Sequence, residues 1–290
     1  MGNSDDGVTF NPCSSTGNSQ QRRLLSLLNP SQGQYYGSIT QLDDGGTQSY
    51  NALLFSVERR LSRNLTVNGN YTWSHCIADI NGGSWVGSVG GGLNDANDRR
   101  RDRGNCQTQT GTGANQSLDR RHLFNINGVL EAPRFKGRML RAVASDWILS
   151  NSYRYQSAQF LTATVGSDYA LNGSAVERPN QLLVNPLCAN PGTGCWINPA
   201  AFSTTVPYGT FGNLGRSNIP GPTFFELDSA LSRVFRVRES MSLELRGEAF
   251  NLTNSTRLNA PTTARNSSSF GQILSTQDPR IMQVAAKFVF

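Results

Sequence analysis

The chain has 290 residues, of which 37 % are hydrophobic and 29 are glycine, and its formal net charge is +6. Mean hydropathy is −0.41, and no stretch approaches the run of about 20 apolar residues that a transmembrane helix requires. This composition argues against a helical membrane span and against one large packed core. Transmembrane strands remain possible, because they need only about 9–11 residues with every second one apolar.

The first 33 residues form a polar lead-in. Residues 1–16 lack the basic start, the apolar run and the cleavage site of a signal peptide, and Cys13 has no obvious partner. We interpret residues 1–33 as an extracellular loop remnant. The missing export signal and the odd cysteine together suggest a start codon inside a longer coding region.

Eight segments of the remaining chain alternate apolar and polar residues with the period of a half-buried strand. A weaker example covers 34–42, and the cleanest, 241–249, places Met241, Leu243 and Leu245 opposite Ser242, Glu244 and Arg246. The predicted strands are 34–42, 49–60, 65–74, 124–130, 147–156, 225–232, 241–249 and 282–290.

The connectors between these segments alternate between short and long. The short ones are 61–64, 131–143 and 236–239, and the long ones are 76–119, 157–222 and 253–277, with a modest 43–48 connector on the long side. Short turns on one side and long loops on the other are typical of a membrane barrel. Unstructured loops of this length count against the alternative, a soluble β-sandwich. Residues 34–290 are therefore predicted to form an all-β, antiparallel transmembrane β-barrel portion.

The final segment ends on aromatic residues. Phe288 and Phe290 lie on its apolar face, which fits an aromatic girdle at the membrane boundary, and we predict that they form the terminal barrel signal. The last strand should run from outside to periplasm, which places the long loops outside the cell. The polar faces of the strands should line a wet lumen. The lumen-facing candidates are Glu58, Glu226, Asp228, Glu244, Arg246, Glu248 and Lys287.

Four cysteines bracket two polar loops. Cys76 and Cys106 enclose a Gly-rich segment, and Cys188 and Cys195 enclose a short Pro/Gly loop. Such pairs fit disulfides formed in an oxidising compartment, although reduced thiols are the alternative. Zinc binding is disfavoured, because no CxxC occurs and the two histidines lack ligand spacing.

Other polar clusters give no defined chemistry. The basic run at 99–103 fits a solvated loop, with anionic lipid headgroups as the second choice, and lacks the features of a nucleic-acid site. His122 beside Asp119 could be drawn as a base, but no nucleophile motif accompanies it. The Gly run at 82–92 fits a flexible loop better than a phosphate cradle. Six residues could supply oxygen ligands to calcium, but their spacing matches no EF-hand and a hydrated polar loop is preferred: Asp79, Asn81, Asp95, Asn97, Asp98 and Asp102.

Several segments, in order, resemble the C-terminal barrel region of the Oar-like group of TonB-dependent outer-membrane receptors. They include LNPSQGQYYGSITQLDDG, YNALLFSVERRLSRNLTVNGNYTWSHC, DRRHLFNINGVLEAP, ERPN, CWINPAAFS, GTFGNLGRSNIPGPTFFELDSALSRVF, SLELRGEAFNLTN and AAKFVF. Together they cover most of the chain from about residue 28. The resemblance implies barrels of about twenty-two strands filled by an N-terminal plug, of which this chain would be roughly the last third.

The resemblance also implies a function. The chain would be the C-terminal part of a transporter that takes up a large substrate across the outer membrane, a fragment without signal peptide or plug. Expected partners are outer-membrane lipid, the barrel-assembly machinery and, through the N-terminal part, the TonB complex; no cofactor, enzyme activity or nucleic-acid partner is expected. The alternative is an outer-membrane adhesin or surface-binding barrel without transport.

Overall fold

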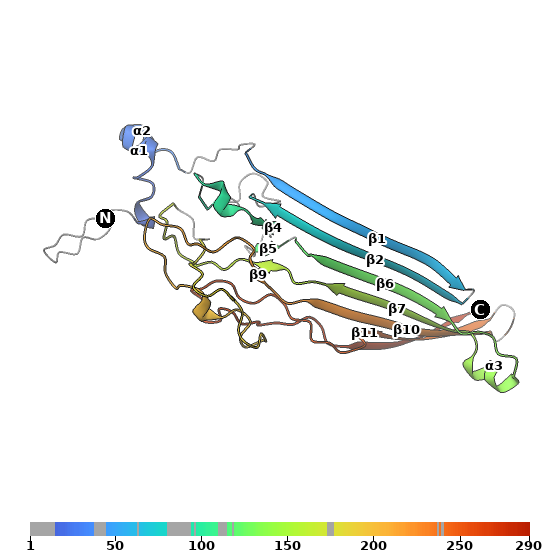
Figure 1. Cartoon of the computed structure of the whole chain (residues 1–290). Helices are drawn as coiled ribbons and strands as arrows, with labels where there is room; N and C mark the ends of the chain where they lie inside the picture. The colour runs from blue at the N-terminus through green and yellow to red at the C-terminus, as the bar shows by residue number, and fades with distance from the viewer. Residues whose placement is uncertain are drawn as a thin grey trace.

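Seven long strands form one curved antiparallel sheet, with the connectors gathered beyond its two ends (Figure 1). The computed structural model describes residues 15–37, 45–62, 64–79, 94–95, 97–109, 115–117, 119–172, 177–236, 238 and 241–290. Each long strand pairs with the next long strand along the chain. In spatial order they are β1 (Gln48–Ser62), β2 (Leu65–Ala78), β6 (His122–Glu131), β7 (Trp147–Gln156), β10 (Phe224–Arg236), β11 (Ser242–Phe250) and β12 (Ile281–Val289).

These seven strands confirm seven of the eight predicted segments, and the antiparallel all-β class with them. The strands are 9 to 15 residues long, which is enough to cross a bilayer when tilted. In the described part of the chain, no helix is long and apolar enough to cross a membrane. Alternation identified the strands because one face of each is predominantly apolar and the other predominantly polar.

The predicted strand at 34–42 is wrong over its described part. Residues 34–37 follow a short helix, α2 (Pro30–Gly33), and 38–42 lie outside the described residues. The Asn29 side chain accepts a hydrogen bond from the Gln32 N–H at 3.3 Å, and Pro30 occupies the first helical turn. Both are strong helix-start features, and they prevail over a weak alternation pattern.

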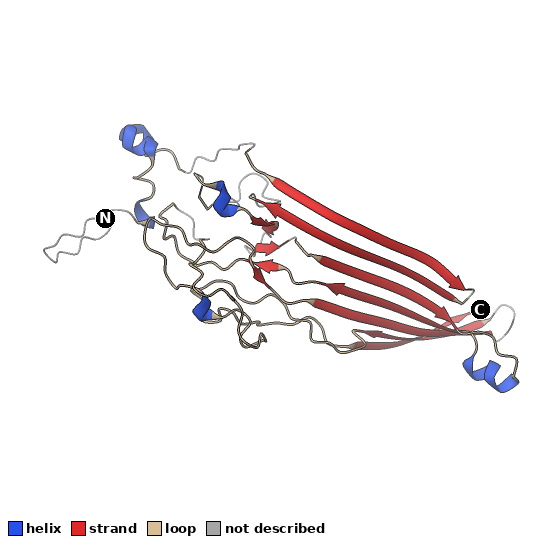
Figure 2. Ribbon diagram, in the orientation of Figure 1, coloured by secondary structure: helices blue, strands red, loops and turns tan. Residues whose placement is uncertain are grey.

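Small elements occupy the connectors, and the helices lie beyond the ends of the sheet (Figure 2). β3 (Gly104–Asn105) pairs with β2 as a short eighth strand of the main sheet, whereas β4 (Gln107–Gln109) pairs with β5 (Asn115–Ser117) and β8 (Phe160–Leu161) pairs with β9 (Ile219–Pro220). The short helices are η1 (Thr16–Asn18), α1 (Leu24–Leu28), η2 (Arg99–Asp102), α3 (Arg138–Ala144) and η3 (Pro199–Ala201).

The described sheet is open, with β1 at one edge and β12 at the other. Every residue of β12 is exposed. Because seven strands alternate in direction, β1 and β12 run the same way. Pairing these two edges with each other would therefore create a parallel contact in an otherwise antiparallel sheet.

The larger hydrophobic core of the described residues lies in the long connectors, and a smaller cluster of Cys76, Ala78 and Cys106 lies at the end of β2. Residues of 157–222 and 253–277 pack together beyond the end of the strands, and we call this unit the loop cap. Its buried apolar residues are Leu161, Ala163, Ile197, Ala201, Phe202, Leu214, Ile219 and Phe270. The long connectors thus form folded structure, which their irregular sequence did not predict.

Gly271 lies at a tight point of the loop cap. Its φ is +78°, and an added Cβ would lie 2.1 Å from the carbonyl oxygen of Ile197. Its own carbonyl oxygen accepts the Trp196 N–H at 2.7 Å, so the backbone cannot move away without losing this bond. Glycine is therefore required here by both conformation and space.

We expect Gly271→Ala to lower the free energy of unfolding of the loop cap by about 2 kcal/mol or more, because it adds a left-handed alanine and a backbone clash. The measurement is denaturant unfolding followed by tryptophan fluorescence. Gly192→Ala is the matched control, since a Cβ there meets nothing within 4 Å. Equal stability of the two variants would contradict the conclusion that glycine is required at position 271.

Candidate functional site

The strand register sorts the side chains of the sheet onto two chemically different faces. Directly opposed residues share a face, so each chain of pairings traces a row across the sheet. One row contains Phe55, Tyr71, Phe124, Tyr155 and Phe225. This aromatic row belongs to a face that is predominantly apolar.

The opposite face carries a polar row in the same strands. It contains Glu58, Asn68, Asn127, Ser152 and Asp228. The rows coexist because neighbouring residues of a strand point to opposite sides. One face therefore suits hydrocarbon and the other suits water.

All seven predicted lumen-facing residues lie on this polar face. The structure adds their partners: Glu244 is opposite Lys287, and Glu248 contacts both Arg246 and Gln283. Their common face follows from the register, whereas their contact with a lumen remains a prediction.

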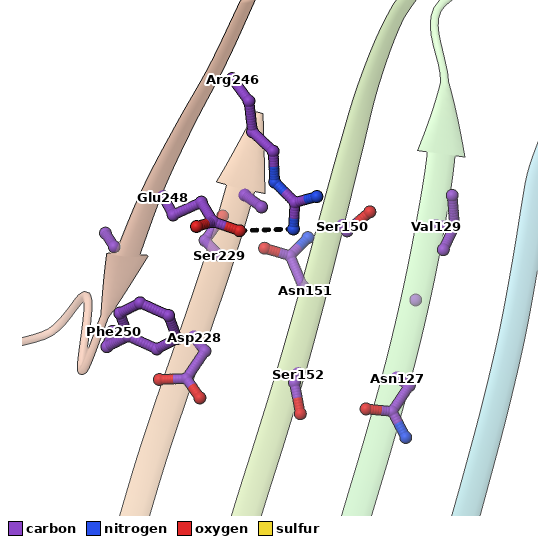
Figure 3. A pocket seen from close by; sticks show the side chains of 13 residues that line it. Asn127, Val129, Ser150, Asn151, Ser152, Asp228, Ser229, Arg246, Glu248 and Phe250 are labelled. Atoms are coloured by element: carbon purple, nitrogen blue, oxygen red, sulfur yellow. Dashed lines mark ion pairs between the residues drawn. The ribbon is translucent and has the colours of Figure 1, made fainter. Parts of the chain in front are cut away.

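The polar face is hollowed. An open pocket of about 360 Å³ spans β6, β7, β10 and β11, and Asn127, Ser152, Asp228, Arg246 and Glu248 are among its lining residues (Figure 3). A pocket across four adjacent strands requires the sheet to curve around it. The polar face is therefore the concave one, as expected for the inner wall of a barrel.

Glu226 joins the sheet to the loop cap. Its carboxylate pairs with Arg154 of β7 and with Arg257 of the 253–277 connector, and Arg257 is 8 % exposed. Both guanidinium groups lie over the Phe224 ring, at 5.2 and 5.8 Å from its centre. Arg257 also donates to the Asp278 carbonyl oxygen at 2.6 Å. The cap is therefore anchored at the mouth of the concave face.

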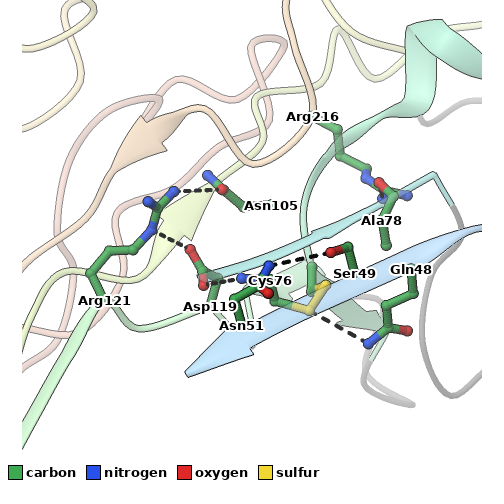
Figure 4. Close-up of a disulfide and its surroundings, with 10 residues drawn as sticks. Gln48, Ser49, Asn51, Cys76, Ala78, Asn105, Asp119, Arg121 and Arg216 are labelled. Atoms are coloured by element: carbon green, nitrogen blue, oxygen red, sulfur yellow. Dashed lines mark hydrogen bonds and ion pairs between the residues drawn. A yellow bond between two sulfur atoms is a disulfide. The ribbon is translucent and has the colours of Figure 1, made fainter. Parts of the chain in front are cut away.

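The first predicted disulfide fastens the end of β2. Cys76 and Cys106 are bonded with their Cα atoms 5.2 Å apart (Figure 4). The Asp119 carboxylate accepts the Cys76 N–H at 2.8 Å and pairs with Arg121 at 2.7 Å. Arg121 also donates to the Asn105 side chain at 2.9 Å. The DRR segment at 119–121 therefore organises structure around the disulfide.

The second predicted disulfide, Cys188–Cys195, closes a short loop of the cap. Both pairings are confirmed, while Cys13 lies outside the described residues. His122 is separated from the carboxylate that the sequence placed beside it: its Nδ1 lies 2.8 Å from the Tyr71 hydroxyl oxygen, and Asp119 is bonded to Cys76 and Arg121. The hypothetical pairing of His122, as a general base, with Asp119 is therefore not formed.

The acidic residues that were considered as calcium ligands form hydrogen bonds and ion pairs with other residues of the chain. Asp79 accepts the Thr47 N–H at 2.6 Å, and Asp102 is 4 % exposed and pairs with Arg178 at 2.6 Å. Among the described residues, no cluster of three His, Cys, Asp or Glu side chains could hold a metal ion. Asn81 and the Gly run at 82–92 lie outside the described residues.

The side chains of the basic run are mostly exposed, as the solvated-loop interpretation predicts, but the run also makes specific contacts. The Arg101 carbonyl oxygen accepts a bond from Arg178 at 2.7 Å, and the Arg103 guanidinium reaches the Thr47 hydroxyl at 3.2 Å. The Arg101–Arg178 bond and the buried Asp102–Arg178 pair bind the 76–119 connector to the cap, whereas the Arg103 contact binds it to the 43–48 connector. Sequence reasoning missed this role, because the partners are 76 residues apart.

Glu177 is a buried acid of the loop cap. It is 0 % exposed, and its carboxylate accepts the N–H groups of Tyr169 and Ala170 at 2.9 Å. Burial raises its pKa from 4.5 to about 7, and the neighbouring Asp168 carboxylate adds to the rise, although the two N–H bonds oppose it. The folded cap therefore favours the protonated form of Glu177.

These features define a class of protein. A sheet with an apolar face, a polar concave face, short connectors at one end and long ones at the other is the wall of a membrane β-barrel. A family model described as an outer membrane beta barrel domain matches residues 3–283. The chain belongs to this outer membrane β-barrel domain family, and its predicted location in the outer membrane is confirmed. No curated protein and no solved structure matches the chain significantly.

Glu226→Gln should weaken the attachment of the cap to the sheet. The change removes the carboxylate between two guanidinium groups, and leaving the buried Arg257 without its ion pair should cost about 3 kcal/mol. Urea unfolding combined with limited proteolysis of the 253–277 connector measures the effect. Glu244→Gln changes a carboxylate of the same face near the other end of the sheet and should leave this connector protected. Equal protection in both variants would contradict the anchor.

The stability of the loop cap should depend on pH through Glu177. Because the folded-state pKa is raised, the stabilisation is complete below pH 4.5 and is lost as the pH rises through about 7. Protease resistance of the cap, measured across this range, should decline towards neutral pH. Glu177→Gln, which keeps an oxygen acceptor without a charge, should abolish the decline. A Gln variant with an unchanged pH profile would rule out Glu177 as the cause.

Proposed function

We propose that this chain is the C-terminal wall of a TonB-dependent outer-membrane transporter for a large substrate. The observation that carries the proposal is the open sheet with its charged concave face. Small closed barrels are filled by their own inward side chains, whereas this face keeps the carboxylates of Asp228 and Glu248 and the guanidinium of Arg246 around an open pocket. Charges on the inner wall suit a wide lumen that holds water or a plug.

The edge strands support a larger barrel. Antiparallel closure between β1 and β12 needs an odd number of additional strands, because the two edges run in the same direction. The completed barrel would then have an even number of strands, as bacterial outer-membrane barrels usually do. The resemblance to TonB-dependent receptors supplies such strands and a plug from an N-terminal part. Energy would reach that plug from the TonB complex in the inner membrane.

An adhesin or surface-binding barrel without transport is the second candidate. The loop cap favours it, since a folded unit with its own core and a disulfide could bind a partner unaided. Leu182, Leu183 and Val184 are exposed on the cap, Val184 to 99 %. The two candidates differ in whether the protein contacts an energising complex.

The test uses the complete gene product in its native cells, with an affinity tag inserted after Val184. After cross-linking in cells, the transporter should capture a TonB-type inner-membrane protein, identified by mass spectrometry. A similarly tagged porin is the negative control, and a TonB-dependent receptor of the same cells is the positive control. Capture by the positive control alone would overturn the transport proposal and favour the surface-binding protein.

A further inference from the structure

The helix α3 lies at the short-connector end of the sheet (Figure 1). It presents an unpacked apolar side. None of its residues is buried, and Met139, Leu140 and Val143 are 83 %, 57 % and 67 % exposed. At about 100° per residue these three side chains fall on one side of the helix, while Arg138 and Arg141 fall on the other. This short helix is therefore amphipathic, with its apolar side facing outward.

The end of the helix is fixed to the apolar side of the sheet. Arg233 of β10, 7 % exposed, donates to the carbonyl oxygens of Val143 at 3.0 Å and Arg141 at 3.4 Å. Its guanidinium lies over the rings of Trp147 and Phe235, and the Trp147 indole N–H donates to the Val143 carbonyl at 2.8 Å. Arg233 is opposite Trp147 and Leu245 on the apolar face. The helix is thereby held beside the face that contacts lipid.

The connector that carries the helix is strongly basic. Residues 132–146 contain Arg134, Lys136, Arg138 and Arg141 but a single acid, Asp146, and the preceding Glu131 ends β6 on the polar face. Asp146 is already paired with Arg134 at 2.8 Å. The remaining cations have no acid of the same connector to neutralise them. Exposed apolar side chains beside unneutralised cations complement a layer of anionic lipid headgroups above acyl chains.

We propose that α3 is an interfacial anchor that lies among the anionic phospholipid headgroups of the periplasmic leaflet. Its apolar side enters the acyl boundary, and Lys136 and Arg138 contact lipid phosphates. The apolar side of α3 lies beside the apolar face of the sheet, which already contacts lipid. Lipid is therefore favoured as the partner of α3 over a second copy of the chain or a periplasmic protein. The inference requires only the membrane-embedded barrel and is independent of transport.

The test places an environment-sensitive bimane probe on the full-length protein in lipid vesicles. Met139→Cys and Ala142→Cys are compared in a Cys13→Ser background, since position 142 lies on the polar side of the same helix. Spin-labelled phosphatidylcholine should quench the probe at 139 several-fold more than the probe at 142, with a blue-shifted emission at 139. Equal, solvent-like emission would overturn the proposal. A blue shift that depends on protein concentration and is insensitive to the spin label would instead assign the surface to a second copy.

Vesicles with and without phosphatidylglycerol test the charge contribution separately. Quenching at position 139 should increase with phosphatidylglycerol, and the double change Lys136→Gln and Arg138→Gln should remove that increase. The same double variant should behave like its parent in pure phosphatidylcholine. Identical quenching in both lipids would overturn the part of the proposal that assigns anionic headgroups.

Discussion

The continuous register of seven antiparallel strands is the constraint on which the rest of the structure depends. In hydrocarbon every backbone N–H and C=O must be paired within the protein, and the ladder from β1 to β12 pairs them across the sheet interior. The side-chain period of two then decides what each face presents. A slip of one residue in any strand would turn its part of the row from Phe55 to Phe225 towards the concave side and its part of the row from Glu58 to Asp228 towards the convex side. The register thus creates both the membrane surface and the inner wall.

The loop cap is a second structural unit, and it is stabilised by different interactions from those that stabilise the sheet. The sheet packs its apolar face against lipid and needs little internal core, which explains why a chain with only 37 % hydrophobic residues can fold this way. The cap, in water, builds a conventional core around Ile197 and Phe202. The pairing of Arg257 with Glu226 connects the units, so the cap lies over one end of the concave face.

The sequence predicted the sheet well because strand alternation is local and repeated. It failed at 34–42, where Asn29 and Pro30 begin a helix that the alternation did not reveal. Both disulfides were predictable, since each pair encloses one loop. The cap was not predictable, because its core residues follow no period and its ion pair between Asp102 and Arg178 joins distant segments. The short apolar stretches 195–197 and 200–202 were the available signal.

The most direct test of the two-faced wall compares adjacent residues of β7. Ser150 lines the concave pocket, whereas Leu149 lies between Leu130 and Leu231 on the apolar face. Single cysteines at 149 and 150, in a Cys13→Ser background, would be exposed to a charged methanethiosulfonate in isolated outer membranes. Rapid modification at 150 with protection at 149 is the predicted result. Equal modification of both positions, or the reverse pattern, would contradict the assignment of the concave face to water and the convex face to lipid.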